Sequence, residues 1–293
     1  MHHGDRLHVS AGGERHEGPP IGALTLDEAA RRLGVHYMTA YRYVRLGRLP
    51  ATQSGGRWFV RPEALRRLVD APAATPGRRP RTWDARRERL QSRLLEGDLL
   101  GCWAIVEQAL TAGASPTDVY LELLAPALRA IGEDWERGTR DVGEEHRASA
   151  VALRLLGRLS PTFTRSGRRR PGTILLGGAP GDPHCIPVAM VADVLRGAGR
   201  TVIDLGANVP ESSVLVAAER THRLFAAGIS VSIDAAKPTA GGVLRALRRA
   251  YPSLLLLAGG PAVRDLKEAR RLGADDWAAD ATGVAQLLLA HER

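Results

Sequence analysis

The sequence predicts a multidomain α/β protein: a winged helix-turn-helix domain, a four-helix bundle, and a flavodoxin-like doubly wound parallel sheet. Three observations predict this fold class. Residues 23–70 contain two short helical patterns around a glycine turn, followed by a hairpin pattern. Helical periodicity then continues through residues 82–165. Residues 173–293 alternate apolar runs with helical patterns, which is typical of βα units in a parallel sheet.

Positive charge is concentrated near the start of the chain. The 293 residues carry a formal net charge of +9. Residues 1–95 hold 18 Lys and Arg against 9 Asp and Glu, whereas the rest of the chain holds 23 of each. A GC-rich genome could also produce an arginine-rich surface, but that bias would spread evenly along the chain. The charge therefore predicts a polyanion-binding module joined to a neutral regulatory body.

Composition also limits where the protein is expected to work. No apolar run approaches 18 residues, so no membrane-spanning helix and no membrane partner are expected. Residues 1–22 lack the apolar core of a signal peptide and are predicted to form a disordered arm. Linkers are predicted at residues 71–81 and 166–172, which are rich in proline and arginine. Two cysteines, Cys102 and Cys185, indicate a reducing cytoplasm rather than a disulfide framework.

The first helix of the module at 23–70 carries its own start signal. Thr25 and Glu28 have the spacing of a capping box, in which each side chain bonds the backbone N–H of the other. The residues expected on the apolar face that follows are Leu26, Ala29, Ala30 and Leu33.

A second helix is predicted over residues 36–46, because Gly47 follows it as a stop signal. A hairpin that turns at residues 54–56 comes next, and Pro62 begins a helix that runs to about Val69. The order of these elements resembles the DNA-binding winged helix of the MerR and excisionase type.

In that arrangement the second helix enters the major groove of double-stranded DNA with its N-terminal end. Arg57, in the wing, is expected to contact the backbone or the minor groove. Tyr43 and Trp58 are interpreted as packing residues. A protein-binding helix pair is the alternative for the whole module. The predicted DNA contacts are His36, Tyr37, Thr39, Arg42, Arg45 and Arg57.

The middle module, residues 82–165, is predicted to be a four-helix bundle that breaks at residues 113–116 and near Gly138. Trp135 is followed after nine residues by Glu145 and His146. An aromatic ring can cover a planar base, and a carboxylate can accept its hydrogen bonds. Packing of Trp135 in the bundle core is the alternative.

The last module, residues 173–293, alternates predicted strands and helices. It contains no Gly-x-Gly-x-x-Gly or Walker pattern, which disfavours a nicotinamide or nucleoside triphosphate site. Strands are predicted at about 173–177, 201–205, 225–232, 254–258 and near Trp277. Helices are predicted at about 187–197, 211–223, 241–251, 263–272 and 282–291.

Three predicted strands of this module end in small or polar residues, so these residues are expected at one edge of the sheet. A neutral imidazole is a good metal ligand, and a nearby carboxylate fixes its tautomer. The predicted site residues are Asp182, His184, Ser230, Ser232, Gly259 and Gly260.

These residues resemble the motif of the cobalamin-binding domain of methionine synthase and the methylmalonyl-CoA mutases: Asp-x-His-x-x-Gly, then a serine element, then Gly-Gly. The resemblance implies that His184 is the lower axial ligand of cobalt. It also implies that Ser230, Ser232 and the glycines lie along the nucleotide tail of the cofactor. Pro187 stands in place of the motif glycine, but proline suits the first turn of a helix, so the following helix is still expected.

With the bundle motif added, the chain from residue 23 onward resembles the CarH/LitR-type light-responsive, adenosylcobalamin-dependent repressors. The resemblance implies that Trp135 and Glu145 cap the adenosyl group of the cofactor, adenosylcobalamin, and that His146 lines the same face. It implies a non-enzymatic regulator that binds its DNA operator in the dark as a homo-oligomer, a tetramer, and is released when light cleaves the cobalt–carbon bond.

One residue departs from the pattern of this family. Glu136 stands where family members often have a histidine that binds cobalt after illumination. Two other functions stay open: a light-independent, cobalamin-sensing repressor, and a corrinoid methyl carrier that serves an enzyme. A methyl carrier has no use for a basic winged helix.

Overall fold

The computed structural model describes residues 22–33, 40–41, 44, 49–54, 57–65, 82–163 and 169–292. Residues 1–77 and 78–293 form two compact units. Most of the predicted arm and all of the linker at 71–81 lie outside the described residues. Five predicted DNA contacts also lie outside them: His36, Tyr37, Thr39, Arg42 and Arg45.

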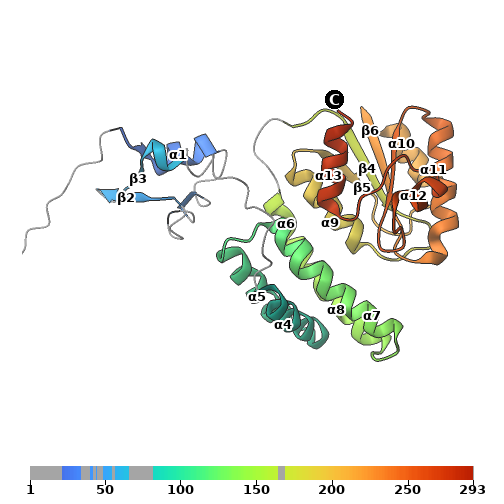
Figure 1. The fold of residues 1–293 in the computed structure, drawn as a ribbon, viewed down its shortest axis with the longest axis horizontal. Helices are drawn as coiled ribbons and strands as arrows, with labels where there is room; N and C mark the ends of the chain where they lie inside the picture. The colour runs from blue at the N-terminus through green and yellow to red at the C-terminus, as the bar shows by residue number, and fades with distance from the viewer. Residues whose placement is uncertain are drawn as a thin grey trace, which may run out of the picture. The chain divides into compact units, whose positions relative to one another are not determined.

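The first unit contains a small antiparallel sheet in the order β1-β3-β2 and one labelled helix (Figure 1). The strands are β1 (Leu24–Thr25), β2 (Ala51–Ser54) and β3 (Arg57–Val60), and the helix is α1 (Leu26–Leu33). Residues 62–65 are also helical, after the predicted start at Pro62. The predicted hairpin is confirmed by the pairing of β2 with β3, whereas the short β1 was not predicted.

The predicted capping box begins α1. The backbone N–H of Thr25 donates to Glu28 Oε2 at 2.8 Å, and the backbone N–H of Glu28 donates to Thr25 Oγ1 at 3.3 Å. Hydrogen bonds from Thr25 lower the pKa of Glu28. Leu26, Ala29 and Ala30 are buried in the core of the unit, and Trp58 packs against that core as predicted.

The second unit begins with the predicted bundle. Its elements are α4 (Thr82–Glu96), α5 (Leu99–Thr111), the continuous rod α6 (Pro116–Asp118), η1 (Val119–Leu124) and α7 (Ala125–Glu136), and then α8 (Val142–Leu159). A single 3-10 turn, η2 (Ser160–Phe163), ends it. The predicted breaks at 113–116 and Gly138 are confirmed. Gly97, in the left-handed region at φ +78°, adds a break between α4 and α5.

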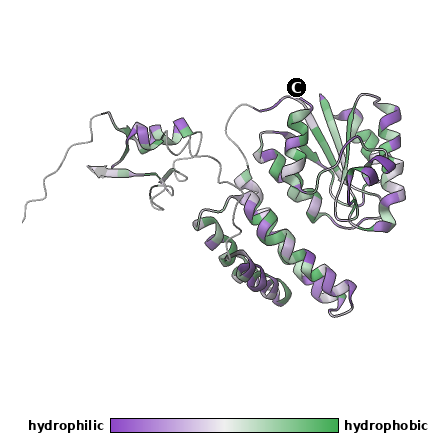
Figure 2. Ribbon diagram, in the orientation of Figure 1, coloured by the Kyte–Doolittle hydropathy of each residue, from purple (hydrophilic) through white to green (hydrophobic). Residues whose placement is uncertain are grey.

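The sheet that follows is parallel, in the order β5-β4-β6-β7. Its strands are β4 (Thr173–Gly178), β5 (Thr201–Asp204), β6 (Leu224–Ser230) and β7 (Leu255–Gly259). In Figure 2 these strands are predominantly apolar, as a sheet covered on both faces requires. The predicted fifth strand near Trp277 is reduced to one bridge between Leu257 and Asp276.

Helices cover both faces of this sheet. One core joins Leu175, Ile229 and Leu256 to α10 (Glu211–Arg220), α11 (Lys237–Ala250) and α12 (Leu266–Leu272). Another core joins Ile174, Leu176 and Leu257 to α9 (Ile186–Gly197) and α13 (Ala281–Ala290). The domain is therefore doubly wound, as predicted. None of the helices in the described ranges is long and apolar enough to cross a membrane.

A buried polar cluster joins the bundle to α9. The carboxylate of Asp193, which is 3% exposed, accepts hydrogen bonds from Tyr120 Oη at 2.8 Å, Ser160 Oγ at 2.8 Å and Arg196 at 3.0 Å. Burial raises the pKa of Tyr120, so its phenol stays protonated and donates. Tyr120 belongs to the rod that ends in α7, and Ser160 follows α8. Both helices of the α7–α8 hairpin are thus anchored on one carboxylate of α9.

We expect Asp193→Ala to destabilise the second unit. The substitution leaves the buried Tyr120 hydroxyl without its acceptor, which costs about 1–3 kcal/mol of unfolding free energy. Tyr120→Phe is the matched control. It removes the hydroxyl itself, so no buried donor is left without an acceptor, and it should cost less. Urea unfolding followed by circular dichroism measures both variants. Equal midpoints for Asp193→Ala and the wild-type chain would contradict this role.

Candidate functional site

The candidate site lies at the carboxyl edge of the parallel sheet, between β4 and β6. The chain leaves β4 toward α9 on one face of the sheet and leaves β6 toward α11 on the other. The connections from these two neighbouring strands therefore run to opposite faces at this point. Such a switch point is the usual ligand crevice of doubly wound sheets. The structure brings together here the predicted residues that follow β4 and those at the end of β6.

Asp182 ties the two loops to each other. Its carboxylate is 1% exposed; Oδ1 accepts from His184 Nδ1 at 2.8 Å and from the His184 backbone N–H at 3.1 Å. Oδ2 accepts from the backbone N–H of Ser232. Burial acts to raise the pKa of Asp182, but the hydrogen bonds from His184 and Ser232 outweigh it and lower that pKa. Asp182 is therefore a buried anion that is hydrogen-bonded to Nδ1 of the imidazole.

His184 is oriented for binding through its free nitrogen. Its side chain is 46% exposed, and Nδ1 is held by Asp182. In the neutral ring, Nδ1–H donates a hydrogen bond to that carboxylate. Nε2 is then the unprotonated nitrogen and can ligate a metal. The hydrogen bond to Asp182 raises the pKa of His184, burial opposes this, and the charges of Asp182 and Glu145 raise it further.

The hydroxyl of Ser232 fits a polar ligand group. Ser232 Oγ is buried and has no hydrogen-bond partner within the described part of the chain. A buried hydroxyl without a partner is costly, so the site is built for a group that the protein itself does not supply. Ser230, at the end of β6, is half-buried. The Ser232 hydroxyl suits the predicted nucleotide tail of a cobalamin.

Gly259, the last residue of β7, and Gly260, which follows it, have different surroundings. Gly260 lies at φ +99°, and a Cβ there would come within 2.5 Å of the carbonyl oxygen of Val231. Gly260 is therefore required for this loop to pack beside the Ser232 loop. A Cβ at Gly259 would make only an ordinary contact, with the carbonyl oxygen of Ala278 at 3.8 Å, so no close approach requires glycine there.

Asn208, in the turn between β5 and α10, supports the histidine loop. Its backbone lies in the left-handed region at φ +50°, and its Oδ1 accepts from the Gly181 N–H at 2.7 Å. Pro187 lies in the first turn of α9, so the helix begins as expected despite the departure from the motif. The support of the histidine loop by Asn208 was not predicted from the sequence.

The bundle presents its predicted residues where α7 ends and α8 begins. Trp135 is 45% exposed, so it is not a bundle-core aromatic. Glu145 accepts from Ser149 Oγ at 2.6 Å and pairs with His146 Nδ1 at 2.5 Å. Burial acts to raise the pKa of Glu145, but Ser149, His146 and the charge of His184 lower it.

The negative charge of Glu145 raises the pKa of His184, and the charge of His184 lowers the pKa of Glu145, so the two groups interact electrostatically. Glu136 is the last residue of α7. No group of three or more His, Cys, Asp or Glu in the described ranges could hold a bare metal ion. A cobalt held by a corrin ring would need only one protein ligand, and the free Nε2 of His184 fits that requirement.

The candidate DNA-contact surface is described only in part. Arg57 is exposed on β3, as a wing residue should be. The ring of Trp58 meets that of Tyr41 edge-on, with centroids 6.4 Å apart. Tyr43 and the remaining predicted contacts lie outside the described residues.

Three regions of the chain match known families. Residues 23–71 match a helix-turn-helix domain, and residues 86–160 and 172–286 each match a B12 binding domain. The chain is thus a protein with a helix-turn-helix domain and B12-binding regions.

Among curated proteins, the chain is 32% identical over 162 residues to the HTH-type transcriptional repressor CarH of Myxococcus xanthus. That match covers 55% of this chain and 52% of CarH. The chain is also 25% identical over 131 residues to monomethylamine corrinoid protein 1 of Methanosarcina mazei, covering 44% of this chain and 60% of that protein. It therefore spans between half and three-fifths of the length of these relatives. The match to CarH and the domain content confirm the resemblance to CarH-type proteins.

The solved structure of the Methanosarcina barkeri monomethylamine corrinoid protein is similar to this chain in fold. The TM-score is 0.63 at 20% sequence identity, covering 71% of this chain and 99% of the other. At this identity the likeness supports the fold alone.

Proposed function

We propose that this chain is a transcriptional repressor that uses adenosylcobalamin as cofactor and light sensor, and that it is not an enzyme. One observation carries the proposal: a helix-turn-helix domain precedes a B12-binding region in which Asp182 holds Nδ1 of His184 and leaves Nε2 open. We further propose that the protein works in the cytoplasm, and that in the dark it binds operator DNA as a homotetramer.

In this proposal each site residue has one task. His184 would hold the cobalt through Nε2, and Asp182 would fix the tautomer of His184. Ser232 and Ser230 hydrogen-bond the tail, while Gly259 and Gly260 shape the space beside it. Trp135 covers the adenine, Glu145 accepts its hydrogen bonds, and His146 lines the same face. When bound, adenosylcobalamin supplies a cobalt–carbon bond that light can break.

The proposal is tested by spectra of the reconstituted chain before and after illumination. We expect the visible spectrum of bound adenosylcobalamin to change irreversibly on illumination. Methylcobalamin that bound equally well, together with a DNA affinity indifferent to light, would favour the light-independent cobalamin sensor.

A corrinoid methyl carrier is the second candidate, since corrinoid proteins of Methanosarcina are similar to this chain. The match to the helix-turn-helix domain at residues 23–71 favours regulation instead. Binding of duplex DNA by the full chain separates the two functions, because a methyl carrier needs none.

We expect Trp135→Ala to reduce the preference for adenosylcobalamin over methylcobalamin by about 2- to 10-fold. The adenine loses its aromatic contact, and such contacts contribute about 0.5–1.5 kcal/mol beyond buried area. Dark dissociation constants for both cofactors measure the preference. Leu100→Ala, an exposed apolar residue of α5, is the control and should change neither. Unchanged binding of both cofactors by Trp135→Ala would remove this residue from the site.

DNA binding should depend steeply on salt, with a log–log slope of about −0.9 per phosphate contact. Arg42→Ala should cost roughly 1–3 kcal/mol on the preferred sequence if Arg42 contacts a base edge. Arg57→Ala should weaken binding to all sequences alike and reduce the salt slope by about 1. Anisotropy titrations of labelled duplexes measure these effects. Full-length wild-type protein that bound no duplex at low salt would contradict the DNA-binding assignment.

A further inference from the structure

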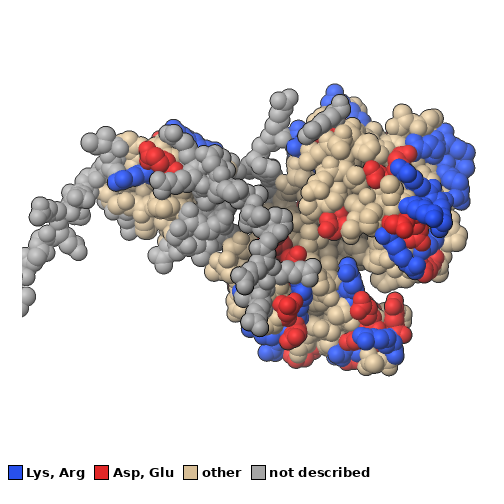
Figure 3. Space-filling view, in the orientation of Figure 1, with Lys and Arg blue, Asp and Glu red and all other residues tan. Residues whose placement is uncertain are grey.

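The turn between α7 and α8 is held by a network of charged side chains. Basic and acidic side chains intermingle where these two helices meet (Figure 3). Asp134, 23% exposed, accepts from Arg137 at 2.7 Å and from Arg140 Nε at 3.1 Å. The backbone carbonyl of Asp134 also accepts from Thr139 Oγ1 at 2.8 Å. Hydrogen bonds to Asp134 therefore hold the end of α7 and the turn that follows it.

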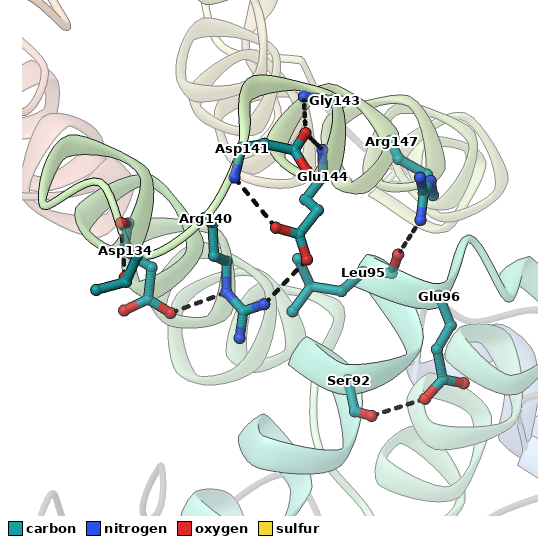
Figure 4. Close-up of polar contacts among 10 residues, drawn as sticks. Ser92, Leu95, Glu96, Asp134, Arg140, Asp141, Gly143, Glu144 and Arg147 are labelled. Atoms are coloured by element: carbon teal, nitrogen blue, oxygen red, sulfur yellow. Dashed lines mark hydrogen bonds and ion pairs between the residues drawn. The ribbon is translucent and has the colours of Figure 1, made fainter.

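Arg140 extends this network to α8. Its guanidinium lies between Asp134 and Glu144, bonding Glu144 Oε1 at 3.2 Å (Figure 4). Glu144 also reaches back to the backbone N–H of Asp141 at 3.1 Å, and Asp141 Oδ1 accepts from the N–H of Gly143 at 2.6 Å. The start of α8 is thus closed by a capping box that includes the partner of Arg140.

The two carboxylates that Arg140 bridges immediately precede the two predicted cap residues: Asp134 precedes Trp135, and Glu144 precedes Glu145. Trp135 is too exposed for core packing to fix its position. The start of α8 is tied separately to α4, because Arg147 donates to the carbonyl of Leu95 at 3.0 Å. The bridge through Arg140 therefore links the end of α7 to an already anchored helix.

We propose that Arg140 is a positioning residue that sets the separation of Trp135 and Glu145 and so selects the bulky adenosyl upper ligand. This inference rests on the proposed function of the cap. Arg140, Asp134 and Glu144 are all partly buried, and solvent screens such a network less than it screens an exposed pair. Without the bridge, Trp135 and Glu145 each remain on their own helix, but the distance between them is no longer fixed.

The test uses the full-length chain in the dark and measures the dissociation constants for adenosylcobalamin and methylcobalamin. We expect Arg140→Ala to lower the adenosyl-to-methyl preference by about 2- to 10-fold, the same range as loss of the aromatic contact. Arg137→Ala is the matched control, because Arg137 bonds Asp134 at a shorter distance but has no bond to Glu144; its preference should stay within 2-fold. Adding Arg140→Ala to Trp135→Ala should cause little further loss, since both act on one contact.

Glu144→Gln is a second variant, which tests the bridge without removing the helix cap. Glutamine preserves the capping-box bond to Asp141 but removes the charge that faces Arg140. It should also lower the preference, by less than Arg140→Ala does. Circular dichroism confirms that each variant is folded before titration.

The outcomes distinguish the positioning role of Arg140 from the proposed cap role of Trp135 and Glu145. If Trp135→Ala lowers the preference while Arg140→Ala and Glu144→Gln leave it unchanged, the positioning role is overturned and the cap stands. Equal losses in Arg137→Ala and Arg140→Ala also overturn it, because general loosening of the turn then explains both. A wild-type chain that does not distinguish the two cofactors overturns the cap and the inference together.

Discussion

We expect His184→Ala to weaken cobalamin binding by about 10- to 100-fold, as loss of a metal ligand or its support typically does. The physical reason is the free Nε2 of His184, which Asp182 holds at the sheet edge through Nδ1. The visible spectrum of the bound cofactor should change as well, because the lower axial ligand changes. Added imidazole should partly restore both, since it fits the space that the side chain leaves.

His222→Ala is the control for this prediction. His222 is exposed and precedes β6, at the opposite edge of the sheet from His184. Its removal should change neither affinity nor spectrum. Wild-type affinity and an unchanged spectrum in His184→Ala would rule out the ligand role.

The raised pKa of His184 also predicts a pH dependence. As the pH falls through that pKa, a proton occupies Nε2 and competes with cobalt, so wild-type affinity should fall while His184→Ala shows little change. In the chain without cofactor the sign is opposite. The charged pair with Asp182 stabilises the fold fully below the ordinary histidine pKa of about 6.5, and this stabilisation is lost as the pH rises through the folded pKa.

The second large effect concerns assembly. We expect the dark, adenosylcobalamin-bound chain to elute from size exclusion as a tetramer, and the illuminated chain to elute as a smaller species. A ligand holds an assembly only through its higher affinity for that state, so loss of the group that Trp135 and Glu145 contact should weaken the interface. Several winged helices on one operator also bind more tightly than one, so DNA affinity should fall with assembly size.

Glu136 adds a feature to this prediction. With a carboxylate where relatives often have a histidine, we expect a less stable illuminated state. Fresh adenosylcobalamin added in the dark should therefore restore the large species. An assembly size that did not change with cofactor or light would leave a constitutive or purely cobalamin-sensing regulator.

The sequence was sufficient to predict the sheet and its edge, because the relevant signals are local. Asp182 and His184 follow the apolar run of β4 directly, and Ser230 ends β6. The fifth strand near Trp277 was overpredicted. There the Asp275 carboxylate accepts the N–H of Leu256 at 2.7 Å, so a side chain replaces part of the backbone ladder.

Contacts between distant segments were not predictable from the sequence. Tyr120 and Asp193 meet across 73 positions, and a lone tyrosine in a helical pattern carries no signal for such a partner. The role of Arg140 depends on how two helices meet at a turn, which periodicity does not specify. The exposure of Trp135, which excludes the bundle-core alternative, likewise required the packing of the whole bundle.

The most direct test of the account is the affinity of the full-length chain for a duplex carrying its selected binding site, measured in three states. These are the dark chain without cofactor, the dark chain with adenosylcobalamin, and the same complex after illumination. The account predicts tight binding in the second state alone, with affinity lost on illumination. Equal DNA affinity in all three states would contradict it.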